Sequence, residues 1–220
     1  MTDFARARRM MVEGQIRTND VTDLRVQAAF RDVPRERFLP PDRQALAYLD
    51  LDVPLAAAPV RRCLLKPMVF AKLVHAAAIG EGDTVLDVGC ASGYSSAILA
   101  RLAASVVALE EDAALAKLAA ETLAATGATN VRIAAGPLVA GWPPDAPYDV
   151  IVLNGSAEIV PDDLLRQLKE GGRLVGVIGR APVGKAMVYR RSGGHAGAHP
   201  VFDAVAPLLP GFAKPPAFVF

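Results

Sequence analysis

Residues 85–94 read Val85-Leu86-Asp87-Val88-Gly89-Cys90-Ala91-Ser92-Gly93-Tyr94, and they contain the strongest indication of the architecture. The first half is a short apolar run, which is typical of a buried strand. Small residues and two glycines follow, and they allow a tight turn and a close approach of backbone to a ligand. A helix is expected to begin at Tyr94. Strand, small-residue turn and helix in this order predict a ligand loop at the carboxyl end of a parallel strand.

The alternation of short apolar runs with amphipathic segments continues toward the end of the chain. We expect strands at 84–88, 106–109, 130–133, 148–153, 173–178 and 186–190, and helices at 94–102, 112–126 and 161–169. This pattern predicts an α/β fold with a doubly wound, mostly parallel sheet. Residues 1–80 read instead as helices and loops, including a helix from Pro67 to about Ala78. We therefore expect one domain, 1–220, with a helical N-terminal extension (1–80) and an α/β core (81–220).

The composition excludes several classes of protein. The 220 residues are 52% hydrophobic, enough for a sizeable core, and the net charge of +1 does not favour a nucleic-acid partner. No apolar run reaches the roughly 20 residues of a membrane helix, and the N-terminal residues lack the apolar core of a signal peptide. We expect a cytoplasmic protein without a membrane partner.

The cysteines and two of the histidines do not suggest a metal site. Cys63 and Cys90 are expected to be free thiols, because their number and spacing indicate neither a disulfide framework nor a set of ligands. His195 and His199 lie in a glycine-rich segment that predicts a hairpin. The sequence around them supplies no cysteines or acids to complete a coordination sphere, so no metal is expected.

The loop after the first strand of the core favours S-adenosyl-L-methionine over a dinucleotide. The dinucleotide fingerprint requires glycine where this chain has Ala91 and Tyr94. A carboxylate at Asp87 would face a pyrophosphate unfavourably, whereas S-adenosyl-L-methionine carries a sulfonium, an ammonium and no phosphate. Glu110 ends the next strand, where an acid accepts hydrogen bonds from ribose hydroxyls. An acid, two glycines and a second acid in this order predict S-adenosyl-L-methionine as the cofactor.

Beyond this loop, the chain resembles the protein-L-isoaspartate O-methyltransferase family over most of its length. The matching segments are 11–12 (MV), 15–16 (QI), 33–40 (VPRERFLP), 47–50 (AYLD), Pro67, 85–94, Gly141, 147–152 (PYDVIV) and 171–175 (GGRLV). The resemblance implies methylation of the free α-carboxylate of isoaspartyl residues in damaged proteins, after which the ester cyclises and reopens. Such a carboxylate is already ionised at neutral pH, so catalysis is expected to be mainly alignment of its oxygen with the methyl carbon.

The resemblance also implies the site residues. Those implied for the cofactor are Asp87, Gly89, Ala91, Ser92, Gly93, Glu110, Gly136, Leu138 and Asn154. The acceptor loop of the family reads approximately Gly-Gln-Thr-Ile-Ser-Gln-Pro, and this chain has Arg61-Arg62-Cys63-Leu64-Leu65-Lys66-Pro67 in its place. The candidate substrate residues are Arg61, Arg62, Leu65 and Pro67. Arginines in this loop suit an anionic acceptor.

The chain departs from the family pattern in both pockets. Leu65 stands at the active-site serine and has no hydroxyl, so the catalytic residue is not identified and isoaspartyl transfer is predicted to be weak or absent. Pro137 stands where an aspartate would accept from the adenine amino group, and Ala91 replaces a loop glycine. Three functions stay open: an isoaspartyl methyltransferase acting on a protein or peptide, a methyltransferase for another acceptor such as a small acid, and a cofactor-binding protein without catalysis. The sequence does not determine the oligomeric state.

Overall fold

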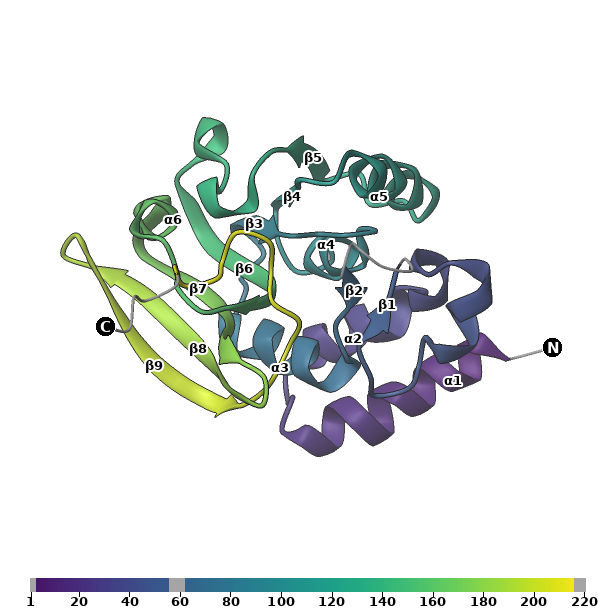
Figure 1. Cartoon of the computed structure of the whole chain (residues 1–220). Helices are drawn as coiled ribbons and strands as arrows, with labels where there is room; N and C mark the ends of the chain where they lie inside the picture. Colours follow the sequence, from purple (N-terminus) through teal and green to yellow (C-terminus); the bar gives the residue numbers. More distant parts are fainter. Residues whose placement is uncertain (1–2, 56–61, 216–220) are drawn as a thin grey trace.

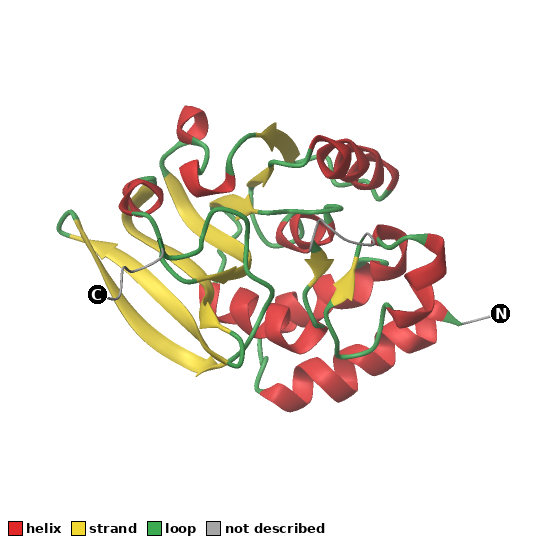
Figure 2. Cartoon of the chain, viewed as in Figure 1, coloured by secondary structure: helices red, strands yellow, loops and turns green. Residues whose placement is uncertain are grey.

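The computed structural model describes residues 3–55 and 62–215 and shows a mixed sheet with helices on both faces (Figure 1 and Figure 2). The helices α1 to α6 span Phe4–Met11, Leu24–Asp32, Pro67–Ala77, Tyr94–Leu99, Ala113–Ala125 and Asp162–Arg166. Short π or 3-10 segments span Val12–Ile16, Arg17–Asn19, Arg35–Phe38, Pro41–Leu46, Leu138–Ala140 and Pro143–Asp145. The strands β1 to β9 span Val53–Pro54, Cys63–Leu64, Thr84–Val88, Ser105–Glu110, Val131–Ala135, Tyr148–Ala157, Leu168–Arg180, Val183–Ser192 and His195–Asp203.

Within the described residues, seven strands form the main sheet in the order β5-β4-β3-β6-β7-β8-β9. The strands β3 to β7 run parallel, whereas β8 is antiparallel to both of its neighbours. The predicted α/β fold with a mostly parallel sheet is therefore confirmed. The strand order reverses at β3, because β4 and β5 lie on one side of it and β6 lies on the other. Ligands of doubly wound sheets bind at the carboxyl end of such a reversal.

The core occupies both faces of the sheet. Successive side chains of a strand point to opposite faces, so the continuous apolar runs of β3 and β4 supply both. Val85 and Val106 face the side covered by α3, α4 and the N-terminal extension. Leu86 and Leu109 face the other side, where they pack with Leu164 of α6 and with Phe212. Burial on both faces explains why these strands show no polar alternation.

A buried arginine joins the extension to the core. Arg35 is fully buried and donates to the carbonyl of Ala47 at 2.7 Å and to that of Leu65 at 2.8 Å. Its guanidinium carbon lies 4.7 Å from the ring centroid of Tyr94. Charged hydrogen bonds of this kind compensate for the burial of the guanidinium. Arg35 therefore fixes the position of the segment that leads from β2 to α3.

The helix expected from Pro67 is confirmed, but the helix expected to continue through Lys169 is not. Leu168 already pairs with Tyr148, so β7 begins where a helical turn was predicted. The two glycines at 171–172, which the sequence suggests as a turn before the expected strand at 173–178, lie inside β7, where the register with β6 shifts and Gly171 has a φ of +78°. A bulge places a left-handed residue within a strand, and in the sequence it looks like a turn.

The last strand, β9, is absent from the sequence prediction. The expected glycine-rich hairpin is present, and it connects β8 with β9, on which His195 and His199 lie. Most side chains of β9 are exposed, so its sequence carries no apolar run.

Residues 3–55 and 62–215 contain neither a membrane-spanning helix nor a metal-binding cluster. Every helix in these ranges is too short or too polar to cross a bilayer. The same ranges contain no group of three or more His, Cys, Asp and Glu side chains placed to hold a metal ion.

Candidate cofactor and acceptor site

The loop that joins β3 to α4 lies against the end of β4. Gly89, Ala91 and Gly93 have φ values of +81°, +55° and +93°. The N–H groups of Gly89 and Cys90 donate to the carbonyl of Leu109 at 2.8 and 3.1 Å. The left-handed conformation costs an alanine about 1 kcal/mol or more, so contacts with β4 must hold the loop in this shape.

Glu110 is the last residue of β4 and is fully buried beside this loop. Its Oε2 accepts from the N–H of Ala91 at 2.8 Å. Its Oε1 accepts from the N–H groups of Glu111 and Asp112 at 3.1 and 3.3 Å. Backbone donors therefore orient both oxygens, as expected for an acid that holds a ligand at a strand end.

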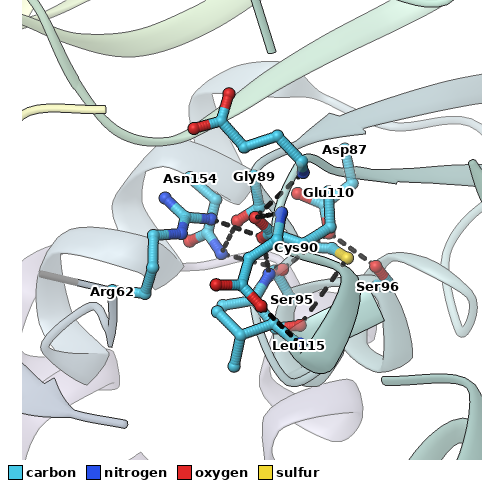
Figure 3. Close-up of polar contacts among 12 residues, drawn as sticks. Arg62, Asp87, Gly89, Cys90, Ser95, Ser96, Glu110, Leu115 and Asn154 are labelled. Atoms are coloured by element: carbon cyan, nitrogen blue, oxygen red, sulfur yellow. Dashed lines mark hydrogen bonds and ion pairs between the residues drawn. The ribbon is translucent and has the colours of Figure 1, made fainter. Parts of the chain in front are cut away.

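Arg62 lies over the same loop and forms an ion pair with Glu110. Its Nη2 is 2.8 Å from Oε2 of Glu110, and its side chain is 6% exposed. A methyl group added at Gly89 would lie 2.7 Å from this Nη2, so the guanidinium rests directly on the glycine backbone. In Figure 3, Arg62 points toward Gly89 and Asn154. The structure thus brings a predicted substrate residue into contact with two predicted cofactor residues.

Asp87 binds the first turn of α4, and Asn154 binds both the loop and α4. Asp87 is fully buried, and its Oδ2 accepts from the hydroxyls of Ser95 and Ser96, both at 2.6 Å. Burial raises the pKa of Asp87 to about 6, although these two hydrogen bonds lower it. The side-chain amide of Asn154 donates to the carbonyl of Gly89 and to the hydroxyl of Ser95, both at 3.0 Å (Figure 3). A direct contact of Asp87 or Asn154 with a cofactor stays a prediction.

A cavity of about 840 Å³ opens beside Glu110 at the carboxyl edge of the sheet. Arg62, Ser156, Arg180 and residues of the segment 206–213 form its other walls. The Ser156 hydroxyl is buried and has no partner among the described residues. The cavity therefore offers a ligand a buried acid, a buried hydroxyl and two arginines.

The segment 206–213, which we name the C-terminal strap, follows β9 and crosses the end of β6. The N–H of Ser156 donates to the carbonyl of Pro207 at 2.8 Å, and that of Leu209 donates back to Ser156 at 2.9 Å. The Leu209 side chain lies so close to Gly155 that an added methyl group there would be 2.6 Å from it. In Figure 1, the yellow chain after β9 turns back across the sheet.

Of the nine predicted cofactor residues, only Glu110 lines this cavity, and three of the others, Gly136, Leu138 and Ser92, make their contacts elsewhere in the fold. Gly136 follows β5 and donates its N–H to the carbonyl of Glu110 at 3.2 Å, with the Trp142 ring packed against it. Leu138 is fully buried in the core. The Ser92 hydroxyl donates to a backbone carbonyl of the N-terminal extension at 2.7 Å. Contacts of these residues with a cofactor stay predictions.

The predicted acceptor loop is divided between the core and the cavity. Leu65 is 2% exposed within the core, and Pro67 is the buried first residue of α3. Burial raises the pKa of the Cys63 thiol to about 12, so this thiol stays protonated at neutral pH. Arg61 lies outside the described residues. Of the predicted substrate residues that the structure describes, Arg62 alone lines the cavity.

The sequence did not indicate Arg180 or the C-terminal strap as parts of the site. Arg180 ends β7, is 75% exposed and lies 3.8 Å from a carboxylate oxygen of Glu158. Both are distant in sequence from the loop at 89–93. The strap lies beside it because it bonds to Ser156 of β6, and the pairing of β7 with β6 brings Arg180 to the same cavity.

The charges of the cavity fit two kinds of ligand group. Glu110 ends β4 and is followed by Glu111 and Asp112, and Arg62 and Arg180 line the same cavity. The acids suit hydroxyl and ammonium groups, and the arginines suit a carboxylate. The buried acid and the unpartnered hydroxyl fit the ribose and amino-acid parts of S-adenosyl-L-methionine.

Comparison with known proteins gives consistent matches over most of the chain. The model of the family described as Protein-L-isoaspartate(D-aspartate) O-methyltransferase matches residues 6–201. Protein-L-isoaspartate O-methyltransferase 1 of Rhodopseudomonas palustris (strain HaA2) is 42% identical over 178 residues, which are 81% of this chain and 71% of the relative. Protein-L-isoaspartate O-methyltransferase of Methanoculleus marisnigri is 39% identical over 174 residues, which are 79% and 78% of the two chains.

Solved structures agree in fold. The solved structure of a protein-L-isoaspartate O-methyltransferase matches with a TM-score of 0.81 and 23% identity, and the match covers 92% of this chain and 66% of that chain. A Plasmodium falciparum protein solved in complex with S-adenosyl-L-homocysteine has a TM-score of 0.78 and 18% identity, covering 92% and 97%. At these identities the two structures support the fold alone.

Proposed function

The chain belongs to the protein-L-isoaspartate(D-aspartate) O-methyltransferase family, and from this premise we propose that it transfers a methyl group from S-adenosyl-L-methionine to the free carboxylate of isoaspartyl residues in proteins. The observation that carries the proposal is the cavity at the carboxyl edge of the sheet, which is lined by the buried acid Glu110, by Arg62 paired with it, and by Arg180. The acid suits a ribose diol, and the arginines suit a carboxylate acceptor.

The residues that would hold the cofactor are those of the loop at 89–93 and Glu110. The loop is bonded to β4, and Asn154 holds it from the side of β6, so its shape does not depend on the ligand. Glu110 would accept from the ribose hydroxyls, and Ser156 would offer its hydroxyl to the amino-acid part. When bound, the cofactor supplies a methyl group on a sulfonium that a carboxylate oxygen attacks directly.

The role of the protein in the transfer is alignment and charge stabilisation. An isoaspartyl carboxylate is ionised at neutral pH, so no side chain has to remove a proton from it. Arg180 and Arg62 would hold the carboxylate, because guanidinium groups bind carboxylates through two parallel hydrogen bonds. Fixing the acceptor oxygen in line with the methyl carbon supplies the rate enhancement.

Leu65 favours a second candidate, a methyltransferase for another carboxylate acceptor. Its side chain is in the core and has no hydroxyl, so this position gives the acceptor no hydrogen bond. An unpaired acceptor oxygen costs roughly 1–3 kcal/mol. We therefore expect isoaspartyl turnover to be lower by about one to two decades than in a family member with serine at this position.

A methyl-transfer assay tests the proposal with an isoaspartyl peptide, the same peptide with ordinary aspartate, and small dicarboxylic acids. We expect methylation of the isoaspartyl peptide alone. In Arg180→Ala, the KM for this peptide should increase roughly tenfold, because the variant loses one charged hydrogen bond to the carboxylate. Arg166→Ala is the matched control, because Arg166 is exposed on α6 and does not line the cavity.

Other outcomes of this assay separate the candidates. Preferential methylation of a small acid would replace the proposal with the second candidate. Equal methylation of both peptides would contradict recognition of the isoaspartyl group. Binding of S-adenosyl-L-homocysteine without transfer to any of these acceptors would indicate a cofactor-binding protein that lacks this catalysis.

We further propose that residues 1–80 and 81–220 act as one domain. One hydrophobic cluster contains Phe30 and Phe38 of the extension together with Val85 and Ile98 of the core. Arg35 and Ser92 add hydrogen bonds between the two parts. The acceptor loop is thereby held at a fixed position next to the cofactor loop.

A further inference from the structure

Glu110 uses all of its acceptor positions in the structure. A carboxylate has about four lone-pair sites, and Glu110 accepts four hydrogen bonds within the described residues. Three of the donors are backbone N–H groups at 91, 111 and 112, which β4 and the loop hold in place. The fourth donor is the side chain of Arg62. A ribose diol that binds Glu110 must therefore replace Arg62, because the backbone donors have no alternative position.

Arg62 also occupies the space over the loop. Its Nη2 and Nη1 atoms lie 2.7 and 3.2 Å from the position of a methyl group built on Gly89. This guanidinium therefore sterically excludes any ligand that packs against the Gly89 backbone. Two independent contacts, the ion pair and the packing on the glycine, thus place Arg62 in competition with a ligand of Glu110.

The displaced guanidinium remains charged and needs an anionic partner. Its Nε has no partner among the described residues even in the ion pair with Glu110. Arg180 lines the same cavity, and its positive charge also attracts an anion. The acceptor carboxylate of the proposed reaction would meet both arginines once Glu110 no longer holds Arg62.

We propose that cofactor binding breaks the pair between Arg62 and Glu110 and thereby releases Arg62 to bind the acceptor carboxylate. This inference rests on the proposed function. Binding is then ordered: the cofactor takes Glu110 first, and the acceptor binds to the released arginine. Arg62 prevents a carboxylate from binding productively before the methyl donor is in place.

Calorimetry with S-adenosyl-L-homocysteine tests the displacement. Arg62→Gln removes the charge that competes for Glu110, so its affinity should rise by roughly 5- to 100-fold, the usual range of coupling between sites. Arg62→Lys keeps the positive charge but loses the planar guanidinium, so its affinity for S-adenosyl-L-homocysteine should rise less. Arg101→Gln is the control, because Arg101 is exposed after α4 and does not line the cavity. Thermal unfolding of each variant verifies that it is folded.

Comparison with S-adenosyl-L-methionine shows whether Arg62 leaves. A guanidinium that stayed over Gly89 would repel the sulfonium, and Arg62→Gln would then favour S-adenosyl-L-methionine over S-adenosyl-L-homocysteine. We expect equal gains for the two ligands. Unchanged or weaker affinity of a folded Arg62→Gln, or a gain confined to the sulfonium ligand, would overturn the displacement.

Peptide binding tests the order. The isoaspartyl peptide should bind the wild-type protein at least roughly fivefold more tightly with saturating S-adenosyl-L-homocysteine than without it. Equal affinity in both conditions would contradict the coupling. A wild-type protein that shows the expected displacement but methylates no isoaspartyl peptide would overturn the proposed function alone. Absence of S-adenosyl-L-homocysteine binding in both wild type and Arg62→Gln would overturn both.

Discussion

At the scale of single residues, Asp87 is a buried carboxylate that, within the described chain, has hydrogen bonds on only one of its two oxygens. It is completely buried, and it accepts two short hydrogen bonds on one oxygen while Oδ1 has no partner among the described residues. Burial raises its pKa from 3.8 to about 6, so the folded protein binds a proton at this site more tightly than the unfolded chain does. A raised pKa means that the stability contributed by this group is complete below about pH 3.8 and is lost as the pH rises through about 6.

Asp87→Asn should remove this pH dependence. The amide oxygen can accept from Ser95 and Ser96, and the amide carries no charge at any pH. The free energy of unfolding of wild type relative to Asp87→Asn should therefore fall by about 2 kcal/mol between about pH 4.5 and about pH 7.5. Urea denaturation of both proteins at the two pH values measures this difference. Parallel pH profiles would show that Asp87 is not the group that titrates.

The sequence identified the residues around the cofactor loop better than it identified their partners. Glu110 lies at the predicted strand end with its carboxylate against the loop. The predicted contacts of Asp87 and Ser92 with a cofactor stay predictions. The sequence did not indicate that the Asp87 carboxylate accepts from two serines of α4, or that Ser92 donates to the extension. Position along a strand fixes which residues are neighbours, but the rotamer and the hydrogen-bond partner depend on packing between distant segments.

At the scale of elements, the C-terminal strap is the part that the sequence did not reveal. Its residues include two prolines, at 207 and 210, and they form no helix or long strand. Their position depends on two backbone hydrogen bonds with Ser156 and on one from Glu158 to Phe212. Such non-local pairing leaves no periodic pattern in the sequence. β9 escaped prediction for a related reason, since an exposed strand lacks an apolar face.

Gly155→Ala should displace the strap and open the cavity wall. The new methyl group would lie 2.6 Å from the Leu209 side chain and 3.0 Å from the Pro207 carbonyl, so one of them must move. We expect the affinity for S-adenosyl-L-homocysteine to fall roughly tenfold, or about 1.4 kcal/mol. The free energy of unfolding should fall by about 1–3 kcal/mol, as for other overpacked positions. Calorimetry and urea denaturation measure the two effects.

Gly197→Ala is the matched control for this substitution. Gly197 also lies on a strand, but an added methyl group there meets nothing within 4 Å. Its affinity and stability should equal those of the wild type within about 0.5 kcal/mol. If Gly155→Ala binds the ligand as tightly as Gly197→Ala does, the strap is not part of the cofactor site.

At the scale of the whole molecule, aromatic contacts make the extension continuous with the α/β core. Phe38 is 1% exposed, and its ring centroid lies 5.5 Å from that of Tyr94, the first residue of α4. Phe30 and Phe70 complete the cluster around Tyr94. The sequence predicted both the helical extension and the core, but the contacts of Phe30 and Phe38 with Tyr94 join residues more than 50 positions apart. Periodicity within each segment carries no information about such contacts.

Phe38→Ala tests whether the two parts unfold as one unit. Removing a buried phenylalanine should cost about 3–5 kcal/mol, and in a cooperative domain this loss affects the entire structure. Trp142 is the single tryptophan of the chain and lies on the opposite face of the sheet from Phe38, so its fluorescence reports on the core. The fluorescence transition of Phe38→Ala should therefore shift to lower urea concentration together with the transition in the helical circular dichroism signal.

Leu24→Ala is the control, because Leu24 is 76% exposed in the same extension. Its free energy of unfolding, measured by either signal, should stay within about 0.5 kcal/mol of wild type. If circular dichroism shifts while Trp142 fluorescence does not, the extension unfolds separately, and the acceptor loop is then held by contacts weaker than those that stabilise the cofactor loop.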